Sequence, residues 1–437
     1  MAKSGGPTVG LDIGSKVIKV AEVVPAKNGV AVKAVGMAPT PPGAMENDVI
    51  VDAKLLGDAV KKLLKESGIQ SRRSVSSVSG QGTVVVRVIE VPKMSDSELS
   101  EQMRWEVERH VPFAANEVIM DFQPIQRADT PPDAQTMEIL LAVAQQDMID
   151  RHVEMLFAAG LTPVAIDVEP LAASRCLIEL GPDPYGKKSV AIVNLGASNT
   201  DLGIYRDGLL SFPRTIPLAG DMLTRAIMQQ LGVDEETAES MKLQYGEVIL
   251  DNVGQQPQPQ AIQDDAFLDF SVGAPIGGGG EAFDLGDAAA GASEPTGGFD
   301  LGVEQPAAQV PAPVEHDPNK LQVFAAIAPV LGEILSEVRR SLEYYQGKTS
   351  DGRVDEILLC GGSSALKGLD KFLEAELGVP TRVADPLQYA PLASRTLSHD
   401  QVAQIAPSLA VAIGLGARDL VSVPTPVASG GRKRGKK

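Results

Sequence analysis

Two stretches of this chain that lie far apart in the sequence are mainly apolar and are interrupted by a glycine. Residues 9–13 and 17–23 flank Gly14, and in an extended second segment Val17, Lys19, Ala21 and Val23 share one face whereas Ile18, Val20 and Glu22 share the other. This pattern predicts two strands, and glycine permits the tight turn that joins them. Residues 190–205 repeat the pattern around Gly196. We therefore predict two strand–turn–strand units, which favour a duplicated fold.

The first turn has the composition of an anion site. Gly14 lets the backbone turn sharply, so the amides of Ser15 and Lys16 can point at an anion. Asp12 stands just before the turn, where a carboxylate can hold a hydrated magnesium ion. An ordinary hairpin that carries an aspartate fits a single such motif equally well. The second copy favours the other interpretation, in which two loops clamp one polyphosphate from both sides.

A third glycine cluster follows an apolar run over residues 354–360. Gly361, Gly362 and Ser363 stand between this predicted strand and a predicted helix over residues 368–377. Paired glycines let the backbone lie flat against a bulky planar group. The cluster therefore indicates a subsite for a nucleoside.

Between the two units the pattern changes. Residues 83–165 indicate a strand, a helix, two strands, a helix and a strand, an order typical of small split units that serve as docking surfaces. Asp52 and Ser95 precede runs with helical periodicity and are predicted helix caps. A long amphipathic helix is predicted over residues 321–345.

Residues 252–318 show neither the helical nor the strand periodicity of apolar residues. No Lys or Arg occurs between Lys242 and Lys320, whereas 13 acidic residues do, so the rest of the chain carries only −5 of the net charge of −18. This composition predicts a disordered acidic insertion. Phe-Asp-Leu-Gly occurs in it twice, at 283–286 and 299–302. The repeat is either accidental similarity in a solvated loop or a pair of weak anchors for a partner.

Composition also limits the class of protein. Cys176 and Cys360 are too few for a disulfide framework, which suits a reducing cytoplasm. Residues 1–6 leave no room for a signal peptide, and no apolar run approaches the roughly 20 residues of a membrane span. The basic tail over residues 426–437 is predicted to be flexible. The four histidines have no metal-ligand spacing, and no arrangement indicates nucleophilic catalysis.

The three glycine segments, in this order, resemble the phosphate-1, phosphate-2 and adenosine motifs of the superfamily of actin, sugar kinases and heat-shock chaperone ATPases. Residues 166–174 and 407–416 resemble its two connecting helices. Outside the insertion, the chain is most similar to the PilM family of type IV pilus assembly proteins, which is related to the division protein FtsA. Lys19 and the helical segment 337–345 are specific pointers to this family.

The resemblance implies an α/β fold, namely a duplicated actin-like (ribonuclease H-like) fold with two lobes and a nucleotide cleft. The first lobe would comprise residues 1–82 and 166–189, and the second would comprise 190–251 and 319–425. Residues 83–165 would form an inserted β-α-β-β-α-β subdomain for partner docking.

The resemblance also implies ATP and Mg²⁺ as ligands, with Asp12 ordering the magnesium waters. Related proteins begin the second phosphate loop with Asp, whereas this chain has Asn194, which brings no charge to the cation. No residue is an obvious candidate for polarising water, so we predict slow or absent turnover and assign no catalytic residue. The residues implied to bind the nucleotide are Asp12, Gly14, Ser15, Lys16, Lys19, Asn194, Gly196, Ala197, Ser198, Gly220, Glu337, Arg340, Gly361, Gly362 and Ser363.

PilM proteins bind the amino-terminal cytoplasmic peptide of the inner-membrane protein PilN in a groove that involves the inserted subdomain. The resemblance therefore implies a cytoplasmic scaffold of the pilus alignment complex, attached to the inner membrane only through this partner, with nucleotide controlling lobe closure and no nucleic acid bound. Motor ATPases and self-association stay open as further contacts. The alternatives are an FtsA-like division protein, which the lack of an apolar flank on the tail disfavours, and a sugar-kinase-like phosphotransferase, which would need an Asp base.

Overall fold

The computed structural model describes residues 6–27, 29–80, 82–111, 114, 116–131, 133–186, 188–249, 317–349, 352–393 and 399–421. Both Phe-Asp-Leu-Gly segments and the basic tail lie outside the described residues. The chain divides into two units, of which residues 256–317 are one. Everything below concerns the other unit.

The amino-terminal strand–turn–strand belongs to a five-stranded sheet, the core of the first lobe. Strand β1 lies in the middle, antiparallel to β2 and parallel to β6. Helices α1 (Ala53–Glu66) and α3 (Gln146–Ala158) bury their apolar faces against the side of the sheet that carries Val9, Leu11 and Val20. The strands, in spatial order, are β3 (Gly29–Pro39), β2 (Val17–Ala26), β1 (Thr8–Ile13), β6 (Arg73–Val78) and β10 (Thr162–Val168).

A second five-stranded sheet repeats this topology strand by strand. Its central strand is again antiparallel to the next strand and parallel to a later one. This repetition confirms the predicted duplicated actin-like fold. The strands, in spatial order, are β13 (Leu209–Ile216), β12 (Thr200–Arg206), β11 (Ser189–Leu195), β14 (Glu356–Cys360) and β15 (Thr381–Val383).

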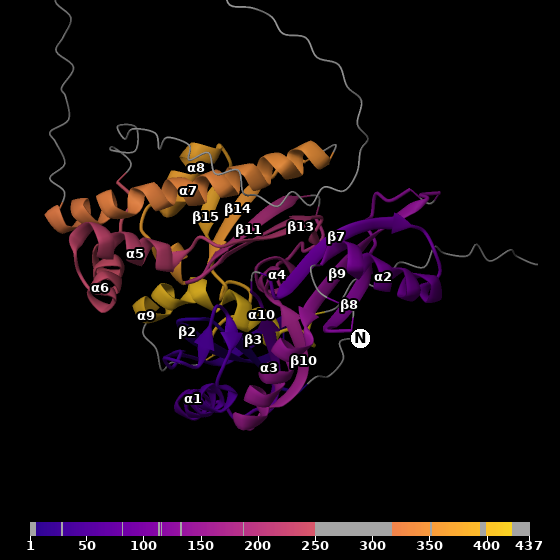
Figure 1. The fold of residues 1–437 in the computed structure, drawn as a ribbon, viewed down its shortest axis with the longest axis horizontal. Helices are drawn as coiled ribbons and strands as arrows, with labels where there is room; N and C mark the ends of the chain where they lie inside the picture. The colour runs from indigo at the N-terminus through magenta and orange to yellow at the C-terminus, as the bar shows by residue number, and fades with distance from the viewer. Residues whose placement is uncertain are drawn as a thin grey trace, which may run out of the picture. The chain divides into compact units, whose positions relative to one another are not determined.

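Four helices cover the outer side of the second sheet, and α7 runs along its whole width (Figure 1). By length and composition α7 could cross a membrane, which the sequence analysis did not anticipate, but half of its apolar window is buried and core helices pass the same test. The four helices are α5 (Gly220–Leu231), α6 (Glu235–Tyr245), α7 (Pro318–Lys348) and α8 (Leu369–Leu377).

Two short helices lie between the two sheets: α4 (Glu169–Ser174), at the end of β10, and α10 (Ala410–Gly416), after a single 3₁₀ turn. Helix α9 (His399–Ile405) precedes that turn. Alternate residues of β11 explain this layering, because Ala191 and Val193 face α7 whereas Val190 and Ile192 face α4 and α10. The segment predicted as the first connecting helix is therefore split between the end of β10 and α4.

The inserted segment forms a third sheet. Strands β7 (Val84–Pro92), β9 (Thr136–Gln145) and β8 (Val118–Ile125) lie in this order and pack on α2 (Asp96–His110). Ser95 caps this helix as predicted and forms a capping box with Glu98. The six elements occur in the predicted order, but they do not form one unit. Strand β10 pairs with β6, and α3 packs on α1, because the apolar residues of α3 fit the core of the first lobe.

Close backbone contacts hold the central helices. A Cβ atom on Gly414 of α10 would lie 1.8 Å from the carbonyl oxygen of Ala172 on α4. A Cβ atom on Gly10 of β1 would lie 1.8 Å from the carbonyl oxygen of Ala412 on α10. Only glycine allows α10 to approach both lobes this closely.

We expect Gly414→Ala to lower the free energy of unfolding by about 1–3 kcal/mol, because the added methyl group overlaps the backbone of α4. Gly332→Ala is the matched control on a second helix, since a Cβ atom there meets nothing within 4 Å and alanine favours helix by about 1 kcal/mol. Urea unfolding of both variants checks this. Equal stability of the two variants would show that α10 has room to move away from α4.

Candidate functional site

The two predicted glycine turns have the same geometry. The amide of Gly14 donates to the carbonyl of Val17 at 3.2 Å, and the amide of Gly196 donates to the carbonyl of Asn199 at 3.0 Å. In both turns a Cβ atom on the glycine would lie less than 3 Å from that same carbonyl oxygen. Each loop thus joins two antiparallel strands of its own sheet, as the sequence pattern predicted.

Two further loops close on the second turn. The amide of Gly220, at the start of α5, donates to the carbonyl of Gly196 at 3.2 Å, and the hydroxyl of Ser363 donates to the same carbonyl at 2.9 Å. Gly361 has a left-handed backbone (φ 90°), and a Cβ atom there would lie 2.3 Å from the carbonyl oxygen of Leu195. The loop at Gly196, the start of α5 at Gly220 and the loop at residues 361–363 therefore form one contiguous surface.

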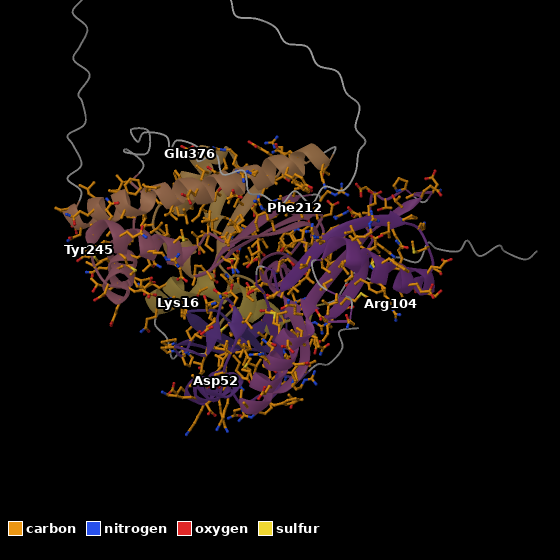
Figure 2. All side chains as sticks on the ribbon, in the orientation of Figure 1. Lys16, Asp52, Arg104, Phe212, Tyr245 and Glu376 are labelled. Carbon is orange, nitrogen blue, oxygen red and sulfur yellow. The ribbon has the colours of Figure 1, made fainter. Side chains whose placement is uncertain are left out.

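A cleft of about 900 Å³ lies where these loops meet. Most of the residues predicted to bind a nucleotide line it, and Gly220 lies beneath its surface. Lys16 lies at the level where the two lobes face each other (Figure 2), and its ammonium contacts Glu235 of the second lobe at 2.5 Å. The predicted residues that line the cleft are Asp12, Gly14, Ser15, Lys16, Lys19, Asn194, Gly196, Ala197, Ser198, Gly361, Gly362 and Ser363.

Glu337 and Arg340 do not line the cleft. Both lie on α7 on the outer side of the second sheet, where Glu337 pairs with Arg214 of β13 and with Arg340. A glutamate and a lysine that do line the cleft from a helix are Glu239 and Lys242 of α6. They have the same three-residue spacing, and Lys242 donates to the hydroxyl of Thr224 at 2.8 Å.

Three carboxyl groups and one ammonium lie in the depth of the cleft. Lys19 contacts Asp12 at 2.9 Å, and both side chains are largely buried. Asn194 donates to Glu169 at 3.2 Å, and Thr215 donates to Asp201 at 2.6 Å. One cation among three carboxyl groups leaves the depth of the cleft acidic.

The pKa values follow from this imbalance. Burial by itself would lower the pKa of Lys19, but the adjacent Asp12 carboxylate outweighs burial and raises it. Burial, together with the neighbouring carboxyl groups, raises the pKa of Glu169 to about 8. Burial likewise raises the pKa of Asp201 to about 6. A cation that enters the cleft would relieve this repulsion.

The chemistry of the cleft therefore fits a magnesium ion that a phosphate ligand brings with it. Among the described residues, no group of three or more His, Cys, Asp or Glu side chains is arranged to hold a metal. Mg²⁺ characteristically keeps several waters and uses one or two carboxylates together with substrate phosphates. Asp12, Glu169 and Asp201 match that requirement as acceptors for such waters.

A hairpin of the first lobe reaches the Gly196 loop of the second. Strands β4 (Met45–Glu46) and β5 (Val49–Ile50) are joined by two residues with left-handed backbone, Asn47 (φ 48°) and Asp48 (φ 63°). The Asp48 carboxylate accepts hydrogen bonds from the hydroxyl of Ser198 at 2.7 Å and from the side-chain amide of Asn199 at 2.6 Å. Asp48 therefore ties the two lobes together across the cleft.

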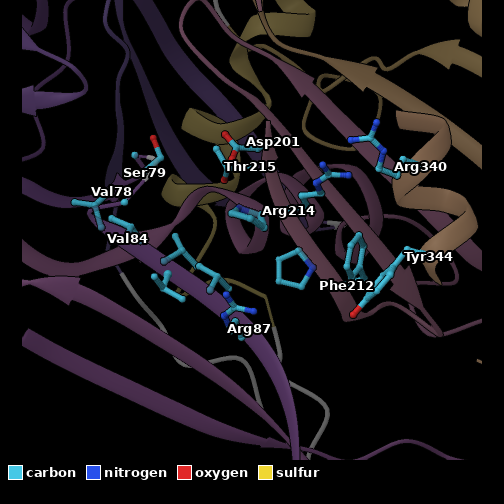
Figure 3. A pocket seen from close by; sticks show the side chains of 17 residues that line it. Val78, Ser79, Val84, Arg87, Asp201, Phe212, Arg214, Thr215, Arg340 and Tyr344 are labelled. Atoms are coloured by element: carbon cyan, nitrogen blue, oxygen red, sulfur yellow. Dashed lines mark hydrogen bonds between the residues drawn. The ribbon is translucent and has the colours of Figure 1, made fainter. Parts of the chain in front are cut away.

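A second cavity, of about 490 Å³, lies between the inserted sheet and the second lobe (Figure 3). We call it the groove. Its two long walls are β7 and β13, each an edge strand of its sheet. Phe212 and Tyr344 stand at one end, with ring centroids 5.4 Å apart, and Asp201 and Thr215 stand at the other. Arg87, Arg214 and Arg340 also line it.

Comparison with known proteins agrees with this geometry. A family model described as type IV pilus assembly protein PilM matches residues 10–248, which include the inserted sheet. A solved structure described as a PilM–PilN type IV pilus biogenesis complex is 27% identical, has a TM-score of 0.71, and is matched over 95% of this chain and 99% of its own. This chain belongs to the PilM family. The family that the sequence resemblance predicted is thereby confirmed.

The second lobe also resembles a division protein. A family model of cell division protein FtsA matches residues 191–414, a range that leaves out the inserted sheet. FtsA of Neisseria meningitidis is 22% identical over 59% of this chain, and FtsA of Pseudomonas aeruginosa is 25% identical over 56%. The match spans 48% and 62% of the length of these two proteins. The PilM-type structure is matched over almost all of its length.

Five of the cleft residues described above were not predicted from the sequence. Asp201 could have been found, because it pairs with Asn194 across β11 and β12 and its side chain therefore lies on the same face. Glu239 and Lys242 have the helical spacing that was assigned to α7 instead. Glu169 and Asp48 carry no local signal, because only the packing of the two lobes brings them to the cleft.

The carboxyl group of Glu169 predicts a pH-dependent stability. Its pKa is raised from 4.5 to about 8, so the folded protein holds this proton more tightly than the unfolded chain does. This stabilisation is complete below about pH 4.5 and is lost as the pH rises through about 8.

We expect Glu169→Gln, which stays neutral, to flatten the pH dependence of the free energy of unfolding between these values, where each pKa unit corresponds to about 1.4 kcal/mol. Urea unfolding across this range, without nucleotide or metal, measures it. Glu66→Gln, at the exposed end of α1, is the control. If the free energy of unfolding of Glu169→Gln changed with pH as steeply as that of the unsubstituted protein, the raised pKa of Glu169 would be contradicted.

Proposed function

We propose that this protein binds ATP with Mg²⁺ in the cleft and serves as a nucleotide-responsive scaffold in type IV pilus assembly. One observation carries the proposal: two glycine loops of identical geometry, one from each lobe, line a single cleft whose depth is acidic and holds Lys19. A triphosphate with its metal ion has the charges that such a site accepts.

The phosphates would lie between the two loops. Backbone amides of Gly14, Ser15 and Lys16 would bind them from one side, and those of Gly196, Ala197 and Ser198 from the other. Magnesium would supply positive charge there, and Asp12 would order its waters. Because Asp48 already occupies the hydroxyl of Ser198, a phosphate at this loop would have to displace or share that hydrogen bond.

The nucleoside would lie against the second lobe. Gly361 and Gly362 present bare backbone to the cleft, and Glu239 and Lys242 approach it from α6. The ammonium of Lys242 is held by the hydroxyl of Thr224, the carbonyl of Gly220 and the carboxylate of Glu239 at 2.7 Å. A hydrogen bond from it to the ribose or the base would replace or share one of these three contacts.

We expect Lys242→Ala to weaken binding of ATP with Mg²⁺ by about tenfold, which corresponds to the loss of one charge-assisted hydrogen bond of about 1.4 kcal/mol. Arg340→Ala is the matched control, since Arg340 has the same helical spacing from a glutamate but lies outside the cleft. Isothermal titration calorimetry measures both. Loss of affinity for ATP in the Arg340 variant alone would place the nucleotide against α7 instead of α6.

Turnover is proposed to be slow. Asn194 stands where related proteins carry Asp, and its amide is engaged by Glu169. Glu169, with its pKa raised to about 8, is largely protonated near neutral pH and is then a poor proton acceptor. Nucleotide would therefore act by holding the lobes together rather than by being consumed.

The groove is proposed to hold the amino-terminal cytoplasmic peptide of PilN, the partner named for the PilM–PilN complex. Edge strands present unpaired backbone groups that an extended peptide can pair with. Val84, Val85 and Val86 of β7, with Phe212 of β13, supply apolar contacts. This partner would attach the protein to the cytoplasmic face of the inner membrane.

We expect Val84→Arg to weaken binding of the PilN peptide by at least about tenfold, because a long charged side chain would fill the groove beside β7. Binding of ATP should not change, since Val84 does not line the cleft. The matched control is Ile119→Arg on β8, the opposite edge of the same sheet, where 40% of Ile119 is exposed. Fluorescence anisotropy with a labelled peptide measures both. Loss of peptide binding in the Ile119 variant instead would move the site to β8.

A further inference from the structure

The cleft and the groove share a wall. Val78, Ser79 and Asp201 line both cavities. Val78 ends β6 of the first lobe, and Asp201 lies on β12 of the second. The two proposed ligands would therefore be separated by a single layer of side chains.

Within this layer, Thr215 is the contact of Asp201 on the groove side. The hydroxyl of Thr215 donates to the Asp201 carboxylate at 2.6 Å, and the two residues are direct partners across β12 and β13. Figure 3 shows both at the end of the groove nearest Ser79. Thr215 itself lines the groove but not the cleft.

On the cleft side, Asp201 is sensitive to whatever charge enters. It is 9% exposed and lies close to Glu169 and Asp12, the two carboxyl groups that interact with the ammonium of Lys19. A magnesium ion or a phosphate in the cleft changes the field at this carboxylate directly. A stronger negative charge on Asp201 also strengthens the hydrogen bond that it accepts from Thr215.

On the groove side, β13 transmits any displacement of Thr215. Phe212 and Arg214 of the same strand line the groove, and Arg214 is bound to Glu337 and Ser341 of α7. The other wall is tied to the same strand pair, because Arg127 of the inserted segment donates to the carbonyls of Arg206 and Leu210. A shift of β13 would thus change the spacing of the two walls.

We propose that Thr215 is a positioning residue that couples the two cavities, so that nucleotide in the cleft changes the affinity of the peptide in the groove, and peptide changes the affinity of nucleotide by the same factor. This inference rests on the proposed function. The Asp201–Thr215 hydrogen bond links the floor of the cleft to the edge strand of the groove.

The test measures peptide affinity in the full chain, with and without saturating ATP and Mg²⁺, for the unsubstituted protein and two variants. Thr215→Val keeps the shape of the side chain and removes the donor, whereas Thr215→Ser keeps the donor. Thr381→Val is the control on β15, the opposite edge of the same sheet, where the hydroxyl donates to the carbonyl of Val379 at 2.8 Å. The probe is a labelled amino-terminal peptide of the cognate PilN.

We expect nucleotide to change peptide affinity by about fivefold or more in the unsubstituted protein and in the Thr215→Ser and Thr381→Val variants. In Thr215→Val each ligand still binds, but the ratio of the peptide affinities with and without nucleotide falls towards one. An unchanged ratio in Thr215→Val overturns the inference, as does a ratio of one in the unsubstituted protein when both ligands bind. Failure of the unsubstituted protein to bind either ligand overturns the proposed function as well.

Discussion

The cleft depends on a local excess of buried negative charge. Asp12 and Glu169 interact with the ammonium of Lys19, which lies 2.9 Å from Asp12, and Asp201 lies close to both carboxyl groups. Burying carboxylates without matching cations is costly, and the protein meets part of this cost by holding protons on Glu169 and Asp201. The site is thus prepared for a cation that the described residues do not themselves provide. Glu169 belongs to the first lobe and Asp201 to the second, so a cation there would attract both lobes at once.

The local sequence pattern was sufficient to predict the two glycine loops, but it did not predict which helical side chains lie at the cleft. Gly14 and Gly196 could be assigned because a tight turn between two strands needs glycine wherever it occurs, and the structure gives both turns the same hydrogen bond. Glu337 and Arg340 were expected at the cleft and lie outside it for the complementary reason. Both faces of the second sheet are covered by helices, and the spacing of charges on α7 contains no information about which face that helix covers. Glu239 and Lys242 have the same spacing and lie on a helix that lines the cleft.

The inserted segment shows a second limit of pattern. Its six elements were predicted in the right order, yet β10 joins the first sheet beside β6 and α3 packs against α1. A strand that follows a helix can pair with any parallel edge within reach, and β6 offered an edge lined by Ser74, Val75 and Ser76 in parallel register. The β7-β9-β8 sheet therefore remains open at β7. That open edge is what allows the groove to form against β13.

The contacts between the lobes are of two kinds, and their difference gives the cleft its capacity to respond. Around α4 and α10 the contact is backbone against backbone, with Gly414 and Gly10 leaving no space for even a methyl group. At the mouth of the cleft the contacts are polar, through Asp48 with Ser198 and Asn199 and through Lys16 with Glu235. Close-packed backbone resists displacement, whereas hydrogen bonds at a solvated mouth exchange readily with water or with a ligand. The contacts near α10 are therefore harder to displace than those at the loops of Gly14 and Gly196. A ligand bound at these loops would meet the contacts of Asp48, which belong to the polar kind.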